Sequence, residues 1–213
     1  MPDEIVPELE PEPSAAGVLF GDRLELARQY TADLARHGEE LGLIGPLEIP
    51  RLWSRHVINC ALMAPLLRPG RVGDVGSGAG LPGLVLAIAR PDVRMILIEP
   101  MERRVDWLLR ETAELGLDNV EVVRARAEEV KLSPWLDQVT ARAVSALSKL
   151  IPLTVPLVRS GGELLFLKGA AVLAELESAA KVIRRARLTD VEILTLGEGL
   201  VPEITRVFRA TVD

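Results

Sequence analysis

The chain has 213 residues, of which 48% are hydrophobic and 26% are charged, and its formal net charge is −6. This length allows one sizeable core with a small appendage. A single cysteine, Cys60, and two histidines, His37 and His56, exclude a disulfide framework and a metal site built from Cys and His ligands. We therefore expect no metal, and chemistry that depends on a bound cofactor or on acidic and basic side chains. No apolar run reaches the roughly 18 residues of a membrane-spanning helix, and the first residues lack the basic start of a signal peptide, so we expect a cytoplasmic protein with no membrane partner.

Residues 1–13 carry much of the negative charge, with five acidic residues, four prolines and no basic residue. Prolines interrupt both helices and central strands, so this composition predicts a disordered acidic tail. The rest of the chain is nearly neutral. The net charge therefore does not argue against a polyanionic partner such as RNA.

We assign residues 14–69 to an N-terminal helical region. Apolar residues at helical spacing predict one helix that follows Asp22, its expected N-cap, and ends near His37, where Gly38 stops it. A second amphipathic pattern between Ile49 and Ala64 predicts another helix. Two helices thus precede the sheet.

From Arg71 onward, short β-branched runs alternate with helical patterns, which is typical of repeated strand–helix–strand units and a mostly parallel sheet. Strands are expected near 71–76, 94–99, 120–125, 138–143, 162–168, 191–197 and 204–212, and helices near 82–90, 101–116, 146–158 and 171–187. No helix separates the last two strands, so we expect them to form an antiparallel hairpin at the sheet edge. This α/β pattern of seven strands resembles the Rossmann-like fold of class I S-adenosylmethionine-dependent methyltransferases. We assign residues 70–213 to this core.

A glycine-rich loop, residues 74–83, directly follows the first strand. Its glycines allow a sharp turn and a close approach of the backbone to a ligand, and Pro82 suits the first turn of the next helix. Residues 78–83 match the dinucleotide-binding pattern G-x-G-x-x-G, and Glu99 follows at the distance expected of a ribose-binding acid. A lone match of that kind does not distinguish NAD from other nucleoside-containing cofactors.

Asp74 favours S-adenosylmethionine over NAD, because an acid just before the glycines would lie unfavourably close to a pyrophosphate, whereas a sulfonium and an amino group tolerate it. Glu99 ends the next apolar run, where a carboxylate can accept both ribose hydroxyls. The alternative is that Asp74 and Glu99 only cap helices.

A third element, Ala127 and Glu128 after Arg126, follows the third strand at the position where class I enzymes usually contact the adenine. A solvated acidic start of a helix is the alternative. By itself this element does not decide between cofactors.

Several segments in order carry a more specific resemblance. They are residues 55–60, 74–83, 126–129, 141–143 and 167–169. Together they resemble the glucose-inhibited division protein B family over residues 20–212, and the most distinctive parts are Leu81 with its following Pro-Gly, Arg142 and Lys168. The resemblance implies a methyltransferase that modifies N7 of a guanine in small-subunit (16S) ribosomal RNA, with the RNA or the small ribosomal subunit as its partner.

The same resemblance, together with the glycine loop, predicts the site residues. The expected cofactor-binding residues are Gly76, Gly78, Leu81, Glu99, Ala127, Glu128 and Arg142. Arg126, Arg142 and Lys168 are expected to face the RNA or the target base. His56 lies on the apolar face of its helix, where a core or interface role is a better interpretation than a catalytic one, and Lys168 also fits a strand that simply ends in water.

Methylation at guanine N7 agrees with these residues. N7 has an in-plane lone pair and no proton, so the reaction needs no general base and no nucleophilic histidine or cysteine. Arg142 and Lys168 are expected at the carboxyl ends of strands, where they can hold guanine O6 or phosphates. Two other functions remain open at this point: an NAD-linked dehydrogenase that uses the same glycine loop, and a non-catalytic RNA-binding scaffold. We expect a monomer.

Overall fold

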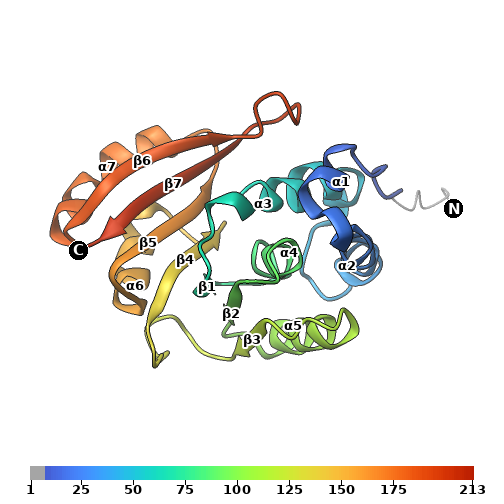
Figure 1. Ribbon diagram of the computed structural model, residues 1–213, viewed down its shortest axis with the longest axis horizontal. Coiled ribbons are helices and arrows are strands. Elements are labelled where there is room, and N and C mark those ends of the chain that lie inside the picture. The colour runs from blue at the N-terminus through green and yellow to red at the C-terminus, as the bar shows by residue number, and fades with distance from the viewer. Residues whose placement is uncertain (1–7) are drawn as a thin grey trace, which may run out of the picture.

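The computed structural model describes residues 8–213, and a seven-stranded sheet crosses its middle (Figure 1). The strands are β1 (Arg71–Val75), β2 (Arg94–Ile98), β3 (Val120–Val123), β4 (Leu136–Arg142), β5 (Val158–Lys168), β6 (Leu188–Leu196) and β7 (Thr205–Val212). Their order is β3-β2-β1-β4-β5-β7-β6. The first five strands pair in parallel, and β7 pairs antiparallel with both β5 and β6. The predicted parallel sheet with a terminal antiparallel hairpin is therefore confirmed.

Helices cover both faces of the sheet, because the central strands are apolar on both sides. One face packs against α1 (Ala15–Phe20), α2 (Leu24–His37), α3 (Asn59–Ala61), α4 (Gly83–Ala89) and α5 (Glu102–Glu114). The other face packs against α6 (Leu147–Thr154) and α7 (Val172–Arg185). The N-terminal helices share one hydrophobic cluster with β1, β2 and α4, so they are part of the main core (Figure 1).

The N-terminal region differs from the prediction in three details. Helix α1 was not predicted, and Asp22 lies in a short 3-10 helix, Gly21–Arg23, instead of capping α2. The predicted second helix is a chain of short pieces: a 3-10 helix at Pro46–Arg51, a π-helix at Trp53–Ile58, α3, and a 3-10 helix at Ala64–Leu66. Pro50 interrupts the pattern because it lacks the N–H of a regular helical bond.

Only residues 8–13 of the expected disordered tail are described by the structure. Residues 8–13 have no helix or strand, but Glu12 pairs with Arg28 at 2.6 Å, and the backbone N–H of Ser54 donates to the Glu10 carboxylate at 2.9 Å. These contacts hold the segment against the N-terminal helices. The composition did not reveal this, because the partners are distant in sequence. Residues 1–7 lie outside the described part.

In the core, every predicted strand and helix is present, with shifts at the ends. The largest is in β5, which begins at Val158 rather than near 162 because the strand runs through Gly161 and Gly162, with an irregular register against β4. None of the helices in residues 8–213 combines the length and the apolar composition of a membrane span.

Candidate cofactor and substrate site

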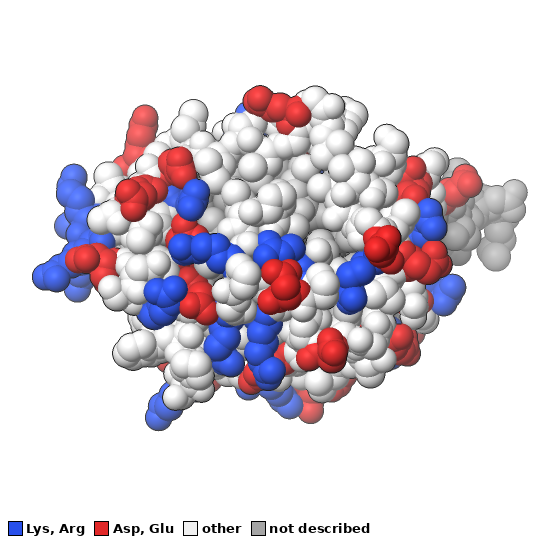
Figure 2. All heavy atoms as spheres, viewed as in Figure 1, with Lys and Arg blue, Asp and Glu red and all other residues white. Residues whose placement is uncertain are grey.

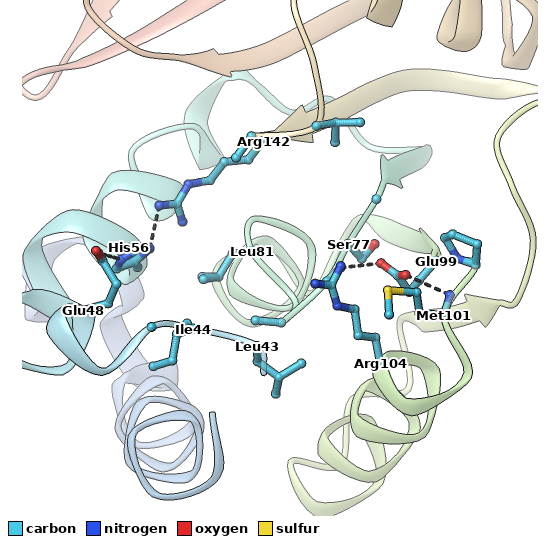
Figure 3. A pocket seen from close by; sticks show the side chains of 17 residues that line it. Leu43, Ile44, Glu48, His56, Ser77, Leu81, Glu99, Met101, Arg104 and Arg142 are labelled. Carbon is cyan, nitrogen blue, oxygen red and sulfur yellow. Dashed lines mark hydrogen bonds and ion pairs between the residues drawn. The ribbon is translucent and has the colours of Figure 1, made fainter. Parts of the chain in front are cut away.

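A cavity of about 550 Å³ opens at the carboxyl edge of the sheet, beside the ends of β1, β2 and β4 (Figure 3). Its walls come from the glycine loop, the residues just after β2, the end of β4, and the N-terminal segment between α2 and α3. Ligands bind at this edge in open α/β sheets, since the loops that follow parallel strands meet there. Five of the predicted site residues line it: Gly76, Gly78, Leu81, Glu99 and Arg142.

The glycine loop forms one wall with its backbone. Gly76 and Gly78 have φ angles of 72° and 56°, in the left-handed region that favours glycine. A Cβ atom on Gly76 would come within 2.9 Å of the Val144 side chain, on the opposite wall. The loop therefore needs glycine here for both its turn and its closeness to the cavity.

Buried side chains from α2 and α5 hold this loop in place. Tyr30 of α2 and Trp107 of α5 both donate to the carbonyl oxygen of Ala79, at 3.0 and 2.8 Å. Both donors are fully or almost fully buried. Because buried polar groups are costly when unpaired, these two bonds hold α2 and α5 to the same point of the loop.

Asp74 does not line the cavity, in contrast to the predicted place of its carboxylate beside the cofactor. Its side chain is fully buried, and Oδ2 accepts the backbone N–H of Gly83 at 3.0 Å, at the start of α4. Ser77 donates to the Asp74 carbonyl at 2.9 Å. Burial raises the pKa of Asp74 to about 7. The helix-capping alternative is the one that holds for this residue.

Glu99 lies at the carboxyl end of β2 and lines the cavity, as predicted. Its two oxygens each accept a backbone N–H at 2.9 Å, from Gly78 and from Met101 (Figure 3). A carboxylate has about four lone-pair sites, so two bonds leave acceptor capacity on the cavity side. Glu99 thus ties the glycine loop to the chain after β2 and still offers oxygens to a ligand.

Arg142 ends β4 and faces the cavity from the other wall. One Nη atom lies 2.6 Å from His56 Nδ1, and His56 Nε2 lies 2.6 Å from a Glu48 oxygen (Figure 3). His56 and Glu48 also line the cavity. His56 is therefore partly a core residue, as expected, and partly a residue of the cavity wall. Burial and the Arg142 charge lower the pKa of His56, against the opposing effect of Glu48.

The remaining predicted residues lie outside this cavity. Arg126 and Glu128 are exposed and Ala127 is partly buried, in a turn after β3 rather than in a helix. Lys168 ends β5 as predicted, but its ammonium pairs with Glu175 of α7 at 2.7 Å and donates to the Ser145 carbonyl at 3.0 Å. Lys168 is therefore placed behind the loop that follows β4.

Sequence reasoning missed several wall residues, among them Leu43, Ile44, Met101 and Arg104. Arg104 points into the cavity, and its Nε has no hydrogen-bond partner within residues 8–213 (Figure 3). For Met101 and Arg104, the sequence offered one indication of a place in the site, namely that both closely follow Glu99. Nothing in the local sequence marked residues 43–44, because they reach the cavity through the packing of α2.

This sheet order, with a glycine loop after β1, an acid after β2 and a terminal hairpin, is the fold of S-adenosylmethionine-dependent methyltransferases, to which solved structures of similar fold belong. One solved structure of similar fold is the N-methyltransferase NodS from Bradyrhizobium japonicum WM9 with S-adenosyl-l-homocysteine. It aligns with a TM-score of 0.55 and 17% identity over 78% of this chain and 92% of that one.

Closer similarity exists at the level of sequence. The family model described as rRNA small subunit methyltransferase G matches residues 23–203. The protein named ribosomal RNA small subunit methyltransferase G from Clavibacter michiganensis subsp. michiganensis is 66% identical over 212 residues, which cover both chains completely. Its counterpart from Leifsonia xyli subsp. xyli is 67% identical over 96% of this chain and 98% of its own length.

The chain belongs to the rRNA small subunit methyltransferase G family. The family resemblance, the methyltransferase class and S-adenosylmethionine as the methyl donor, all expected from the sequence, are confirmed. The dehydrogenase hypothesis, which used the same glycine loop, is therefore set aside.

Proposed function

We propose that this protein transfers a methyl group from S-adenosylmethionine to N7 of a guanine in small-subunit (16S) ribosomal RNA. Names of close relatives support the RNA substrate, and the family resemblance supports the position on the base. The observation that carries the proposal is the pairing of Glu99 and the glycine loop on one wall of the cavity with Arg142 on the other. One wall fits the cofactor, and the other fits an electron-rich base or phosphate.

The residues of the first wall fit S-adenosylmethionine. Gly76 leaves room where a Cβ would collide with Val144, and the Glu99 carboxylate has free lone pairs for the two ribose hydroxyls. Leu81 and Met101 supply apolar surface for the adenine. When bound, the cofactor supplies an electrophilic methyl group on a sulfonium.

The second wall fits a reaction that proceeds by alignment. Guanine N7 attacks with its own lone pair, so no group has to remove a proton. Burial raises the pKa of Cys60, which lies 3.5 Å from Arg142, to about 11, so this thiol stays neutral and is a poor nucleophile. Arg142 holds guanine O6 or a phosphate next to the methyl donor. The rate of methyl transfer then rises because the two reacting groups are positioned close together.

The predicted site residues that do not line the cavity have proposed roles at its margins. Ala127 and Glu128 follow β3, whose end is bonded to Glu99 through the Val123 carbonyl at 3.1 Å, so they extend the cofactor side. Arg126 contacts the RNA around the cavity. Lys168, which pairs with Glu175 and donates to the Ser145 carbonyl, acts on the RNA side through the loop that follows β4. Basic side chains gather in the lower middle of the face in Figure 2, with acids among them, so the net negative charge does not produce a uniformly acidic surface.

A ribosomal substrate also supports a cytoplasmic location, and we infer a monomer as the acting form. The test is methyl transfer in vitro with radiolabelled S-adenosylmethionine and either small ribosomal subunits or deproteinised 16S RNA, both from cells that lack this modification. We expect label in one 7-methylguanosine, mapped by cleavage at the modified base. Label on a different atom would contradict the N7 assignment, and cofactor binding without any transfer would favour the scaffold hypothesis. Comparison of the two substrates shows whether assembly of the subunit is required.

A further inference from the structure

Arg142 is held in the cavity mainly by one neutral ring. Its 2.6 Å contact with His56 Nδ1 is much shorter than its other side-chain contacts, 3.4 Å to the Arg55 carbonyl and 3.5 Å to Cys60 Sγ. Arginine has donors only, so His56 Nδ1 has to be the acceptor. The proton of the neutral ring is then on Nε2, where Glu48 accepts it at 2.6 Å.

Glu48 is well placed to set this tautomer. It belongs to the 3-10 helix Pro46–Arg51, and it also pairs with Arg51 and, at 3.7 Å, with Arg55. Although burial opposes it, hydrogen bonds from His56 and Arg51 lower the pKa of Glu48, so the residue stays an anionic acceptor. His56 belongs to the π-helix Trp53–Ile58, and its ring lies between Glu48 and Arg142.

We propose that Glu48 and His56 are positioning residues for Arg142: Glu48 fixes the Nε2–H form of His56, and the Nδ1 lone pair of that ring holds the guanidinium against the cavity. This inference rests on the proposed function, because it gives Arg142 its orientation toward the RNA base. A second proton on His56 converts Nδ1 into a donor and breaks the bond to Arg142. The charged groups that face the ring are Glu48, Arg55 and Arg142.

The first arm of the test uses methyl transfer to small subunits. His56→Asn keeps an acceptor where Nδ1 lies, whereas His56→Gln keeps a partner for Glu48 and loses the acceptor for Arg142. We expect His56→Gln to lower kcat/KM by about 30-fold and His56→Asn by about 3-fold. In an Arg142→Ala background, His56→Gln should change the rate less than about 2-fold, because it acts through Arg142. Equal effects of both His56 variants, or full additivity with Arg142→Ala, would overturn the proposal.

The pH profile gives a readout that a merely structural residue would not move. Activity of the parent should fall as pH decreases through the pKa of His56, below 6.5, and His56→Asn should lack this acidic limb. Melting temperatures and affinity for S-adenosylhomocysteine serve as controls for folding. A limb that persists in His56→Asn contradicts the proposal.

The second arm does not need activity. The chain has only two histidines, so ¹⁵N NMR of histidine-labelled protein, with His37→Gln as the assignment control, reports the tautomer of His56 directly. At pH 7.5 we expect a neutral ring with a protonated Nε2 and an Nδ1 that shifts in Arg142→Ala. An imidazolium or an Nδ1–H ring overturns the inference. If the parent transfers no methyl group, the proposed function fails, while this arm still decides the inference.

Discussion

The two walls of the cavity are held in different ways. The glycine-loop wall is a backbone surface, fixed by buried bonds to Asp74, Tyr30 and Trp107. The opposite wall is made of long side chains, with Arg142 held by His56. Its loop, residues 143–146, is braced by Lys168 through the Ser145 carbonyl.

This difference matches two different tasks. A buried backbone cradle has little freedom, so it is preorganised for one cofactor of fixed shape. Side chains at a partly exposed edge can adjust to a large substrate such as RNA. Their orientation then depends on neighbouring side chains. The comparison predicts that changes on the glycine-loop side alter cofactor affinity or stability, and that changes on the Arg142 side alter turnover.

The largest expected effect is on cofactor affinity. Glu99→Ala removes the proposed ribose acceptor and leaves the N–H groups of Gly78 and Met101 without their partner. We expect affinity for S-adenosylhomocysteine to fall by about 100-fold or more, measured by isothermal titration calorimetry. Glu102→Ala, three residues away and exposed, is the matched control and should bind normally. Unchanged affinity of Glu99→Ala for S-adenosylhomocysteine would contradict the assignment of the cofactor to this wall.

Next in size is a pH-dependent effect at the seam between α2 and α5, next to the Tyr30 and Trp107 anchors. Glu111 is buried beside Asp33 and Glu114, and burial together with these charges raises its pKa to about 7. The unfolded chain releases this proton near pH 4.5, so stability is lost as pH rises from about 4.5 to 7.

Glu111→Gln should therefore raise the free energy of unfolding at pH 8 by about 1–3 kcal/mol, and this gain should largely disappear at pH 4.5. Urea unfolding at the two pH values measures it. Asp106→Asn, at an exposed position of the same helix and outside this acidic cluster, serves as the control and should change stability by less than about 0.5 kcal/mol. A gain of the same size at both pH values would show that the carboxylate charge is not its cause.

The two anchors of the loop give a smaller effect. Tyr30→Phe or Trp107→Phe alone leaves the Ala79 carbonyl one donor and should cost about 1 kcal/mol from the lost bond, plus a packing cost for the tryptophan. The double variant leaves the carbonyl unpaired, so its loss should exceed the sum, with weaker cofactor binding. Thermal unfolding and calorimetric titration test this. Strictly additive losses of stability would mean that the two bonds do not act together on the Ala79 carbonyl.

Lys168→Met should give the smallest effect and the clearest separation of the walls. It removes the brace on the Ser145 carbonyl, so turnover should fall about 3- to 10-fold while affinity for S-adenosylhomocysteine changes less than about 2-fold. Steady-state kinetics with small subunits and calorimetry provide the two numbers. Lys181→Met, on the exposed side of α7, is the control. A large loss of cofactor affinity would contradict the separation.

Much of this architecture follows from patterns that are local in sequence. The alternation of β-branched runs and helical stretches predicted the parallel sheet, and the chain order predicted its edge hairpin. Parallel strands bring their carboxyl ends to one edge. The positions of Glu99 and Arg142 at strand ends were therefore enough to bring them to the same cavity.

The sequence by itself determined the fold class, the glycine loop and these two strand-end residues, because periodicity and glycine conformation depend on a few neighbouring residues. Only the tertiary structure decided which side chains face the cavity. Asp74 accepts the Gly83 N–H, Lys168 pairs with Glu175, and His56 lies between Glu48 and Arg142. Each of these outcomes depends on a buried or charged partner, often from a distant segment, and such pairings are not encoded in local spacing.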